Sequence, residues 1–221
     1  GKTMGYRACF VALGLFQSDD EAAAWPRFKG TQPTAGDVKY ADLNNDGIMD
    51  ERDKKVVSPY SNTPEIMFGL NLSASWKGFD FSALFQGAAN RNVMLSGFAT
   101  QMFVNGSSNL PKYLYDDRWT PDNRDARYPK AWGPDHPSNN KASTFWLING
   151  NYVRLKNMEL GYSIPKVLLS KVGVERLRVY VGGTNLFSID HMPGYDPEKQ
   201  DGGPNYYPQQ RVFNMGVNIT F

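Results

Sequence analysis

The chain has 221 residues with 24 Lys and Arg against 22 Asp and Glu, and a net charge of +2 without any basic run gives no reason to expect a nucleic-acid partner. Cys9 is the only cysteine, which excludes an internal disulfide and a paired-cysteine zinc site, and we expect it to be buried as a small apolar residue. No apolar stretch reaches 18 residues, so no transmembrane helix is predicted.

The chain opens with GKTMGYRACF, which lacks the basic start and the apolar stretch of a signal peptide. We therefore expect the chain to begin inside a longer protein whose targeting signal lies upstream. The first predicted strand, Tyr6 to Phe16, alternates poorly between apolar and polar residues. It is the least regular of about six strands that the sequence predicts.

The other predicted strands alternate with a period of two, as strands with one apolar face do. Ile66 to Trp76 is followed by a tight turn at Lys77 and Gly78, and a second strand from Phe79 completes a hairpin. Tyr152 to Tyr162 changes its apolar phase in the middle, which predicts a bulge near Asn157. The last two strands in chain order are Leu177 to Asn185 and Arg211 to Phe221.

The connections between these strands differ in length. Lys77-Gly78 and Ser163 to Glu175 are short, whereas the long connections are polar and rich in Pro, Gly, Asn and Asp, and the first of them is expected to have little core. The long ones are Gln17 to Glu65, Asn90 to Gly150, and Ser188 to Gln210. Short turns at one end and long loops at the other are typical of outer-membrane barrels, with the long loops extracellular.

The predicted fold class is therefore all-β, namely the C-terminal part of a large transmembrane β-barrel with about six antiparallel strands here. Six strands cannot close a barrel wide enough for a nutrient, so further strands are expected upstream. The alternative is a soluble, calcium-dependent, carbohydrate-binding β-sandwich, since period two alone does not say whether the apolar face meets lipid or a core. Arg154, Lys156, Arg178 and Arg211 are expected in the barrel lumen or at strand ends.

The final strand carries an unbroken apolar stripe that ends at an aromatic residue. Its members are Phe213, Met215, Val217, Ile219 and Phe221. The opposite face is polar, with Asn214, Gly216, Asn218 and Thr220. The stripe resembles the C-terminal assembly signal of outer-membrane barrels, and we expect it to carry that signal.

The segment from Asp42 to Asp53 has oxygen-bearing side chains at the spacing of an EF-hand calcium loop, with Gly47 at the sharp turn. The predicted ligands of a structural Ca²⁺ ion are Asp42, Asn44, Asp46, Asp50 and Asp53, with the carbonyl oxygen of Ile48. The alternative is a solvated turn stabilised by its own Asx side chains.

Aromatic residues crowd the second long loop, and flat rings there suit a sugar ligand or the surface of a partner protein. They are Tyr113, Tyr115, Trp119, Trp132 and Trp146. The alternatives are that they pack the loop onto itself or form an aromatic girdle of the barrel. His136 and His191 lie in separate loops without a supporting catalytic motif, so we predict no enzyme activity.

Several short segments, taken in their order and spacing, resemble SusC/RagA-type TonB-dependent transporters over nearly the whole chain. They are Gly14-Leu15-Phe16-Gln17, Trp25-Pro26, Gly36-Asp37-Val38-Lys39-Tyr40, Asp42 to Gly47, Asn151 to Asn157, Leu160-Gly161-Tyr162, Leu177 to Tyr180, Asn185-Leu186-Phe187, Gly194-Tyr195-Asp196-Pro197 and the terminal strand.

The resemblance implies that residues 1–221 are one C-terminal segment of a barrel of about 22 strands, plugged by an N-terminal domain. It implies the outer membrane of a Bacteroidetes-like Gram-negative bacterium, a SusD-like surface lipoprotein as lid, and import of glycans or peptides. TonB would supply the energy through the missing N-terminal part. A different outer-membrane barrel and a hydrolase are the other rivals.

Overall fold

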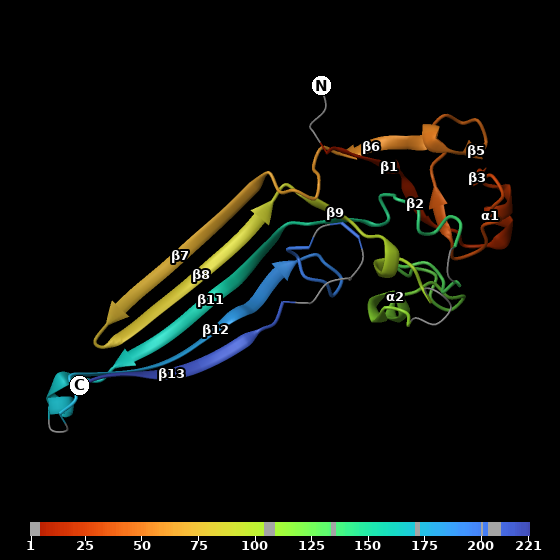
Figure 1. Ribbon diagram of the computed structural model, residues 1–221. Coiled ribbons are helices and arrows are strands. Elements are labelled where there is room, and N and C mark those ends of the chain that lie inside the picture. Colours follow the sequence, from red (N-terminus) through yellow and green to blue (C-terminus); the bar gives the residue numbers. More distant parts are fainter. Residues whose placement is uncertain (1–4, 104–108, 134–135, 171–172, 200, 203–208) are drawn as a thin grey trace. The chain divides into compact units, whose positions relative to one another are not determined.

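The computed structural model describes residues 5–103, 109–133, 136–170, 173–199, 201–202 and 209–221 (Figure 1). The chain divides into two compact units, each formed by three separate segments. The sheet unit comprises Pro64–Asn90, Gly150–His191 and Tyr207–Phe221, and the loop unit comprises Gly1–Thr63, Arg91–Asn149 and Met192–Tyr206. The described helices include none that is long and apolar enough to cross a membrane.

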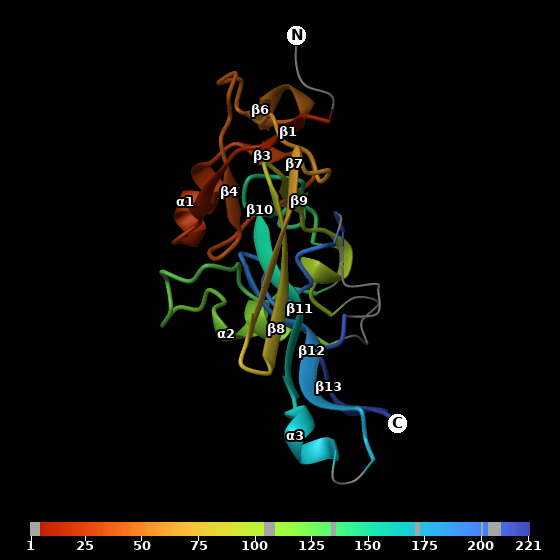
Figure 2. The same cartoon turned by 90° about the vertical axis from the view of Figure 1, so that its left-hand side faces the viewer.

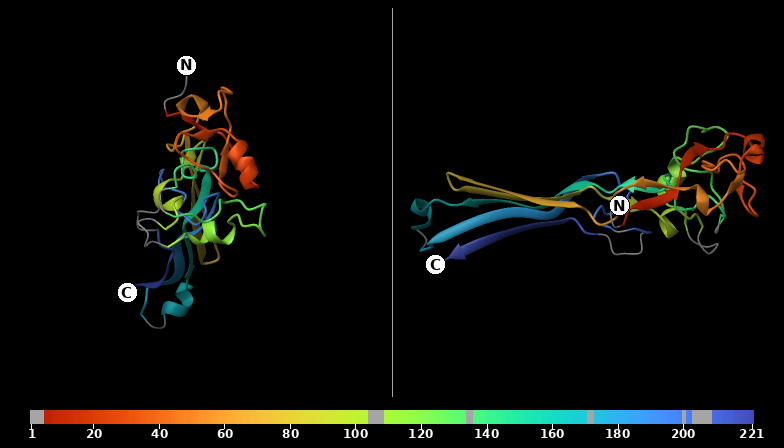
Figure 3. Two further views of the ribbon diagram at one scale, coloured as in Figure 1. Left: turned by 90° about the vertical axis from the view of Figure 1, so that its right-hand side faces the viewer. Right: turned by 90° about the horizontal axis from the view of Figure 1, so that it is seen from above.

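The sheet unit is one antiparallel five-stranded sheet in the order β13-β12-β11-β8-β7, and Figure 2 shows its strands as a single thin layer. Its strands are β7 (Ile66–Trp76), β8 (Phe79–Ala89), β11 (Tyr152–Ser163), β12 (Arg176–Asp190) and β13 (Val212–Thr220). The right-hand view of Figure 3 shows the β7–β8 turn and the short helix α3 (Lys166–Leu169) at the same end of the sheet. The two predicted short connections therefore gather at one end.

The pairing register aligns the apolar residues of all five strands on one face. One cross-strand row runs Ala74, Phe81, Leu160, Val181 and Met215, and the row nearest the β7–β8 turn runs Trp76, Phe79, Tyr162, Val179 and Val217. Side chains that alternate along a strand also line up across strands, so the period-two pattern becomes a continuous apolar surface.

The opposite face is polar and is organised around Arg178. The guanidinium of Arg178 on β12 lies across Gly161, where any β-carbon would overlap it. It reaches one acidic side chain on the neighbouring strand β11 and another on β8, one strand further. Its Nε donates to Asp80 Oδ1 at 2.9 Å, and its Nη2 lies 2.6 Å from Glu159 Oε1. One cation thus links β12 to β11 and β8.

The predicted bulge near Asn157 is confirmed, because the register of β11 shifts between Leu155 and Asn157 against both of its neighbours. The first predicted strand is different. Tyr6 to Phe16 divides into β1 (Arg7–Phe10) and β2 (Ala12–Leu15), which pair within the loop unit and do not extend the five-stranded sheet. Its poor alternation has a physical reason, since these short strands are covered unevenly by the loop segments around them.

The loop unit contains short strand pairs and single helical turns. Its pairs are β1 with β6 (Lys54–Ser58), β2 with β4 (Val38–Tyr40), β3 (Arg27–Phe28) with β5 (Ile48–Met49), and β9 (Asn92–Met94) with β10 (Leu147–Asn149). Its helices are α1 (Asp19–Ala24) and α2 (Lys112–Asp116), with 3₁₀ turns at Glu51–Asp53 and Gly97–Ala99.

The expectation that the first long loop has little core is wrong, and the other two long loops also contribute to a core. One buried cluster combines residues from the second and third predicted loops, including Val93, Leu114, Trp146 and Met192. Another joins Phe10, Val38, Tyr40 and Met49 around the first loop. Each of these segments contributes only a few apolar side chains. Together, side chains from distant segments make up a core that no single segment could form.

Buried hydrogen bonds to Asp37 and Asn139 tie the first loop to the second. Asn139 Nδ2 donates to Asp37 Oδ1 at 2.9 Å, and Asn139 Oδ1 accepts from the backbone N–H of Val38 at 2.8 Å. Burial raises the pKa of the Asp37 carboxyl, but hydrogen bonds from His136, Thr34 and Asn139 outweigh it and lower that pKa below its ordinary value. Asp37 is therefore a buried carboxylate whose charge is satisfied.

Replacing Gly36 with alanine should loosen this junction. Gly36 has a φ of 83°, and a β-carbon there would lie 2.5 Å from the Trp119 ring. The left-handed backbone should cost about 1–2 kcal/mol, and the overlap should cost about 1–3 kcal/mol more. Hydrogen exchange of the Lys130 amide, which donates to Gly36 O at 3.0 Å, measures the loss of local stability.

Gly30→Ala is the matched control, because Gly30 has a φ of 78° with nothing within 4 Å of the β-carbon position. It should show only the backbone cost. Equal destabilisation by the two substitutions would contradict the packing of Trp119 on Gly36.

Candidate functional site

The apolar face of the sheet is a candidate functional surface. Large side chains from all five of its strands are 40–85% exposed. They are Ile66, Phe68, Leu70, Leu72, Trp76, Phe79, Leu160, Val179, Val181, Phe187, Ile189, Phe213, Met215, Val217 and Ile219. A water-soluble protein rarely exposes so wide an apolar patch, whereas the hydrocarbon of a membrane matches it.

The terminal stripe belongs to this face. Met215, Val217 and Ile219 lie on β13 opposite the apolar side chains of Val181, Val179 and Leu177 on β12, and Phe213 lies opposite Gly183. Phe221 follows the strand with its ring exposed. The geometry fits a strand that faces lipid on one side and a polar interior on the other. The assembly-signal role of these residues stays a prediction.

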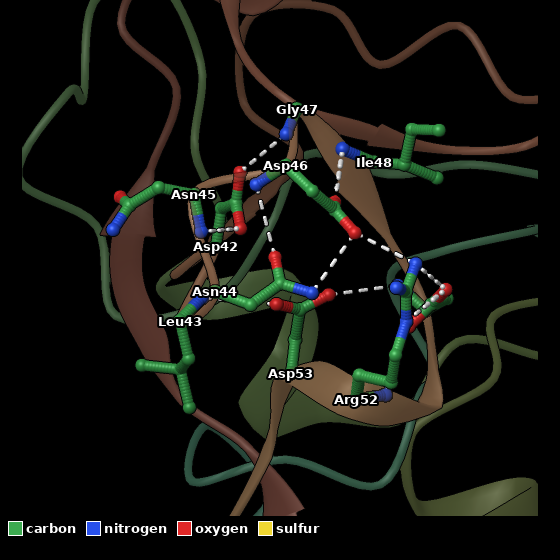
Figure 4. A network of polar contacts seen from close by, with 10 residues as sticks. Asp42, Leu43, Asn44, Asn45, Asp46, Gly47, Ile48, Arg52 and Asp53 are labelled. Atoms are coloured by element: carbon green, nitrogen blue, oxygen red, sulfur yellow. Dashed lines mark hydrogen bonds and ion pairs between the residues drawn. The ribbon is translucent and has the colours of Figure 1, made fainter.

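The aspartate loop is folded by its own side chains, as Figure 4 shows. Asp42 accepts from the backbone N–H groups of Asn45 and Gly47 at 2.8 and 2.9 Å. Asn44 Oδ1 accepts from the Asp46 N–H, and Asp46 Oδ1 accepts from the Ile48 N–H, both at 3.0 Å. These Asx turns bring the first three predicted calcium ligands into one tight loop.

In the second half of the loop, the side chains of Arg52 and Asp53 bind other groups of the same loop. Arg52 Nη2 lies 2.6 Å from Asp46 Oδ2 and 2.8 Å from Asp50 Oδ2. Hydrogen bonds from Arg52 lower the pKa of the Asp50 carboxyl. Asp53 is 0% exposed and accepts from the backbone N–H groups of Leu43 and Asp50 at 2.9 and 2.8 Å.

The described residues contain no group of three or more His, Cys, Asp or Glu side chains arranged to hold a metal ion. A carboxylate oxygen has a second lone pair, so Asp42 and Asp46 could still coordinate Ca²⁺ while they accept N–H groups. Arg52 would then have to leave Asp46. Calcium binding here stays a prediction.

The structure corrects the expectation that five aromatic residues contact a ligand or a lid. Trp146 is 1% exposed, and Trp119 and Trp132 are also buried. Tyr113 packs against the same core, and its hydroxyl donates to the carbonyl oxygen of Ala99. Rings used to close a core cannot stack on a sugar, so the alternative of a loop packed onto itself holds for these four.

Tyr115 differs from the other four rings. It is 53% exposed, and the guanidinium of Arg118 lies 3.9 Å from its ring centroid. A flat ring with a cation stacked on it can meet a sugar, a peptide or a protein surface. Tyr115 therefore keeps the contact role as a prediction.

His136 forms the His–carboxylate pair that sequence spacing did not reveal. Its Nε2 lies 3.3 Å from Asp37 Oδ1, and its Nδ1 accepts from the Asn139 N–H at 3.1 Å. Ser138 Oγ is 3.4 Å from the same Nδ1, but the serine is buried. Because Nδ1 already accepts a hydrogen bond from a backbone N–H, it is not placed to activate Ser138. The His136–Asp37 pair instead helps to join the first loop to the second.

The sequence did not reveal the role of Arg178, which was expected only to face a lumen or to lie at a strand end. It spans three strands to reach Asp80 and Glu159. The alternation of apolar and polar residues along each strand did place Arg178, Asp80 and Glu159 on the polar face. Their proximity depends on the cross-strand register, which no local pattern states.

The sheet defines the class of protein: it is a portion of a transmembrane β-barrel, with an apolar outer face and a polar inner face. No family model matches the chain. Among curated proteins, TonB-dependent receptor P26 of Formosa agariphila is 31% identical over 222 residues, which cover 95% of this chain. Receptor P3 of the same organism is 26% identical over 100% of the chain, and SusC of Bacteroides thetaiotaomicron is 26% identical over 82%.

Solved structures share the fold. The RagAB peptide transporter superposes with a TM-score of 0.70 over 98% of this chain at 22% identity, and the open-open state of the RagAB peptide importer with 0.67 at 23%. These matches cover 22% of each solved chain. The chain belongs to the SusC/RagA-type TonB-dependent transporters and is a fragment of one. It spans 22% of the length of the two Formosa relatives and 17% of SusC.

Placing a charge on the apolar face should destabilise the barrel. Phe213 lies in the cross-strand row of Leu72 and Ala83, near the middle of the sheet. Phe213→Lys puts an ammonium group among lipid tails there, which should cost about 2–4 kcal/mol at the bilayer midplane. The measurement is the unfolding free energy of the full-length protein in lipid vesicles.

Asn214→Lys is the matched control, because Asn214 lies on the polar face of the same strand and pairs with Gly182. It should change the unfolding free energy little. A control as damaging as Phe213→Lys would contradict the assignment of the two faces.

Calcium binding by the aspartate loop should depend on the charge of Asp46. Asp46→Asn keeps an oxygen that can accept from the Ile48 N–H but removes the carboxylate charge that attracts Ca²⁺. The full-length protein, freed of metal with a chelator, should bind Ca²⁺ by calorimetry, resist cleavage in residues 42–53 when loaded, and lose both properties in the variant.

Asp122→Asn removes an exposed carboxylate outside the loop and should behave like the unsubstituted protein. If chelator and added Ca²⁺ leave cleavage of the unsubstituted protein unchanged and no heat of binding is seen, the calcium prediction is wrong.

Proposed function

We propose that the protein containing this segment imports glycans or oligosaccharides, or peptides, across the outer membrane. TonB supplies the energy through a part of the protein outside this chain, and a SusD-like surface lipoprotein acts as the lid. The exposed apolar face of the five-stranded sheet is the observation that carries the proposal, because it fits a barrel wall in lipid. The names of the curated relatives, receptors that depend on TonB, support it.

Transport is favoured over catalysis and over a soluble binding module. In a sandwich, the apolar face of the sheet would be covered by a second sheet. Here Val217 and large side chains from all five strands of that face are exposed. Among the described histidines, His136 comes closest to a catalytic arrangement, but its Nδ1 already accepts a hydrogen bond from the backbone N–H of Asn139.

The substrate class stays open between sugars and peptides. RagAB, which shares the fold, is a peptide transporter, and a sugar would suit the exposed ring of Tyr115. We propose that the loop unit faces the cell exterior, because long loops of outer-membrane barrels lie there. Tyr115 and Arg118 would then be available to substrate or lid.

Uptake should require both the intact transporter and TonB. Cells that express the full-length protein should accumulate one fluorescent class, either oligosaccharides or oligopeptides, and deleting TonB should abolish accumulation. A lipoprotein should co-purify with the transporter. An epitope tag after Asp122, in an exposed turn of the loop unit, should label intact cells.

A tag placed in the β7–β8 turn after Lys77 is the topological control, and it should label only after the outer membrane is permeabilised. Labelling of the Lys77 tag on intact cells would reverse the proposed orientation. Accumulation that persists without TonB would contradict energised import.

A further inference from the structure

The turn end of the sheet combines aromatic rings with a lysine. Trp76 and Phe79 flank the β7–β8 turn, and the Phe79 ring packs on Tyr162 with centroids 4.6 Å apart. Lys77 Nζ lies 4.7 Å from the centroid of the Trp76 ring. Aromatic rings beside a lysine suit the zone where lipid tails meet headgroups, since the rings have both apolar and polar parts.

The connection from β11 to β12 is held against this end of the sheet. The Ser163 N–H donates to Gly78 O at 2.7 Å, and the Ile164 N–H donates to Leu177 O at 2.9 Å. The Glu175 N–H donates to Thr220 O at 2.8 Å. The connection is therefore fixed beside the β7–β8 turn and the last residue of β13.

Helix α3, within this connection, points two apolar side chains away from the protein. Leu169 is buried and fixes the helical turn, whereas Val167 is 78% exposed and Leu168 is 61% exposed. Lys166, the first residue of α3, is also exposed. A turn in water gains nothing by exposing two adjacent branched side chains, so this pair needs an apolar partner.

We propose that α3 is a membrane-interface anchor, in which Val167 and Leu168 enter the headgroup boundary of a phospholipid leaflet. The inference rests on the proposed function, because it requires the sheet to span a membrane. Lys166 and Lys77 would meet the phosphate groups, and the rings of Trp76 and Tyr162 would lie at the same level. The short turns place this leaflet on the periplasmic side.

The apolar surface of the sheet continues onto α3, and this favours phospholipid as the partner of Val167 and Leu168. The row that contains Trp76, Phe79 and Tyr162 is the last row of the apolar face before the turns, and α3 contacts β12 directly beyond it. The apolar surface thus continues from the strands to the helical turn. A short helix with apolar residues beside a lysine is the composition expected at such an interface.

Spin labels test this placement in the full-length transporter reconstituted in phospholipid vesicles. A nitroxide at Val167→Cys is compared with one at Val217→Cys on the sheet face and one at Glu175→Cys in the same connection. Collisions with oxygen, which concentrates in lipid, and with a water-soluble nickel chelate give a ratio for each site. Cys9 is the native cysteine that could also take up label, but it is buried, and burial raises the pKa of its thiol and so slows its reaction. Unsubstituted protein labelled in parallel corrects for this background.

The expected oxygen-to-nickel ratio is highest at position 217, intermediate at 167 and lowest at 175. A high ratio at 217 with equally low ratios at 167 and 175 would overturn the anchor and leave the membrane-spanning sheet intact. A low ratio at 217 would overturn both the anchor and the proposed function. A label at 167 shielded from both reagents would show that another protein covers α3, which also overturns the lipid anchor.

Discussion

The constraint on which the structure depends is that backbone N–H and C=O groups in lipid have no water to bond. Strands meet this constraint only by pairing with one another, and each of the five strands does so with its neighbours. Pairing fixes the register, and the register brings the alternating side chains of every strand onto shared faces. An apolar outer face and a polar inner face follow from the same set of hydrogen bonds.

The bulge shows how strictly the phase is kept. Between paired positions, β8 advances one residue from Leu84 to Phe85, β11 advances two between Leu155 and Asn157, and β12 advances three from Thr184 to Phe187. The one extra residue in β11 reverses the alternation of its side chains relative to β8. The further extra residue in β12 brings its side chains back into the same alternation as those of β8. Asn185 absorbs part of this change with a φ of 52°, a conformation that asparagine tolerates.

The loop unit is stabilised by different physics, because water can reach its backbone. Its stability comes from cores assembled across distant segments and from buried polar groups that find partners. Arg91 is buried and donates from Nη1 to the carbonyl oxygen of Pro197 at 2.8 Å, while Arg7 pairs with Asp201 at 2.7 Å. Removing the partner of Arg91 would leave a buried charge unsatisfied. Contacts of this kind between distant segments help long loops to hold one shape.

The sequence by itself determined the long strands, the apolar face of each strand and the bulge near Asn157, because a period of two is a local property of a strand that has one apolar side. It also identified the aspartate loop, whose Asx turns span only a few residues. Only the tertiary structure decided that Trp119, Trp132 and Trp146 are core rather than surface, that Tyr6 to Phe16 leaves the main sheet, and that Arg178 joins two acids. The physical reason is distance along the chain: Asn139 bonds Val38 across 101 residues, and contacts of that kind leave no periodic trace in either segment.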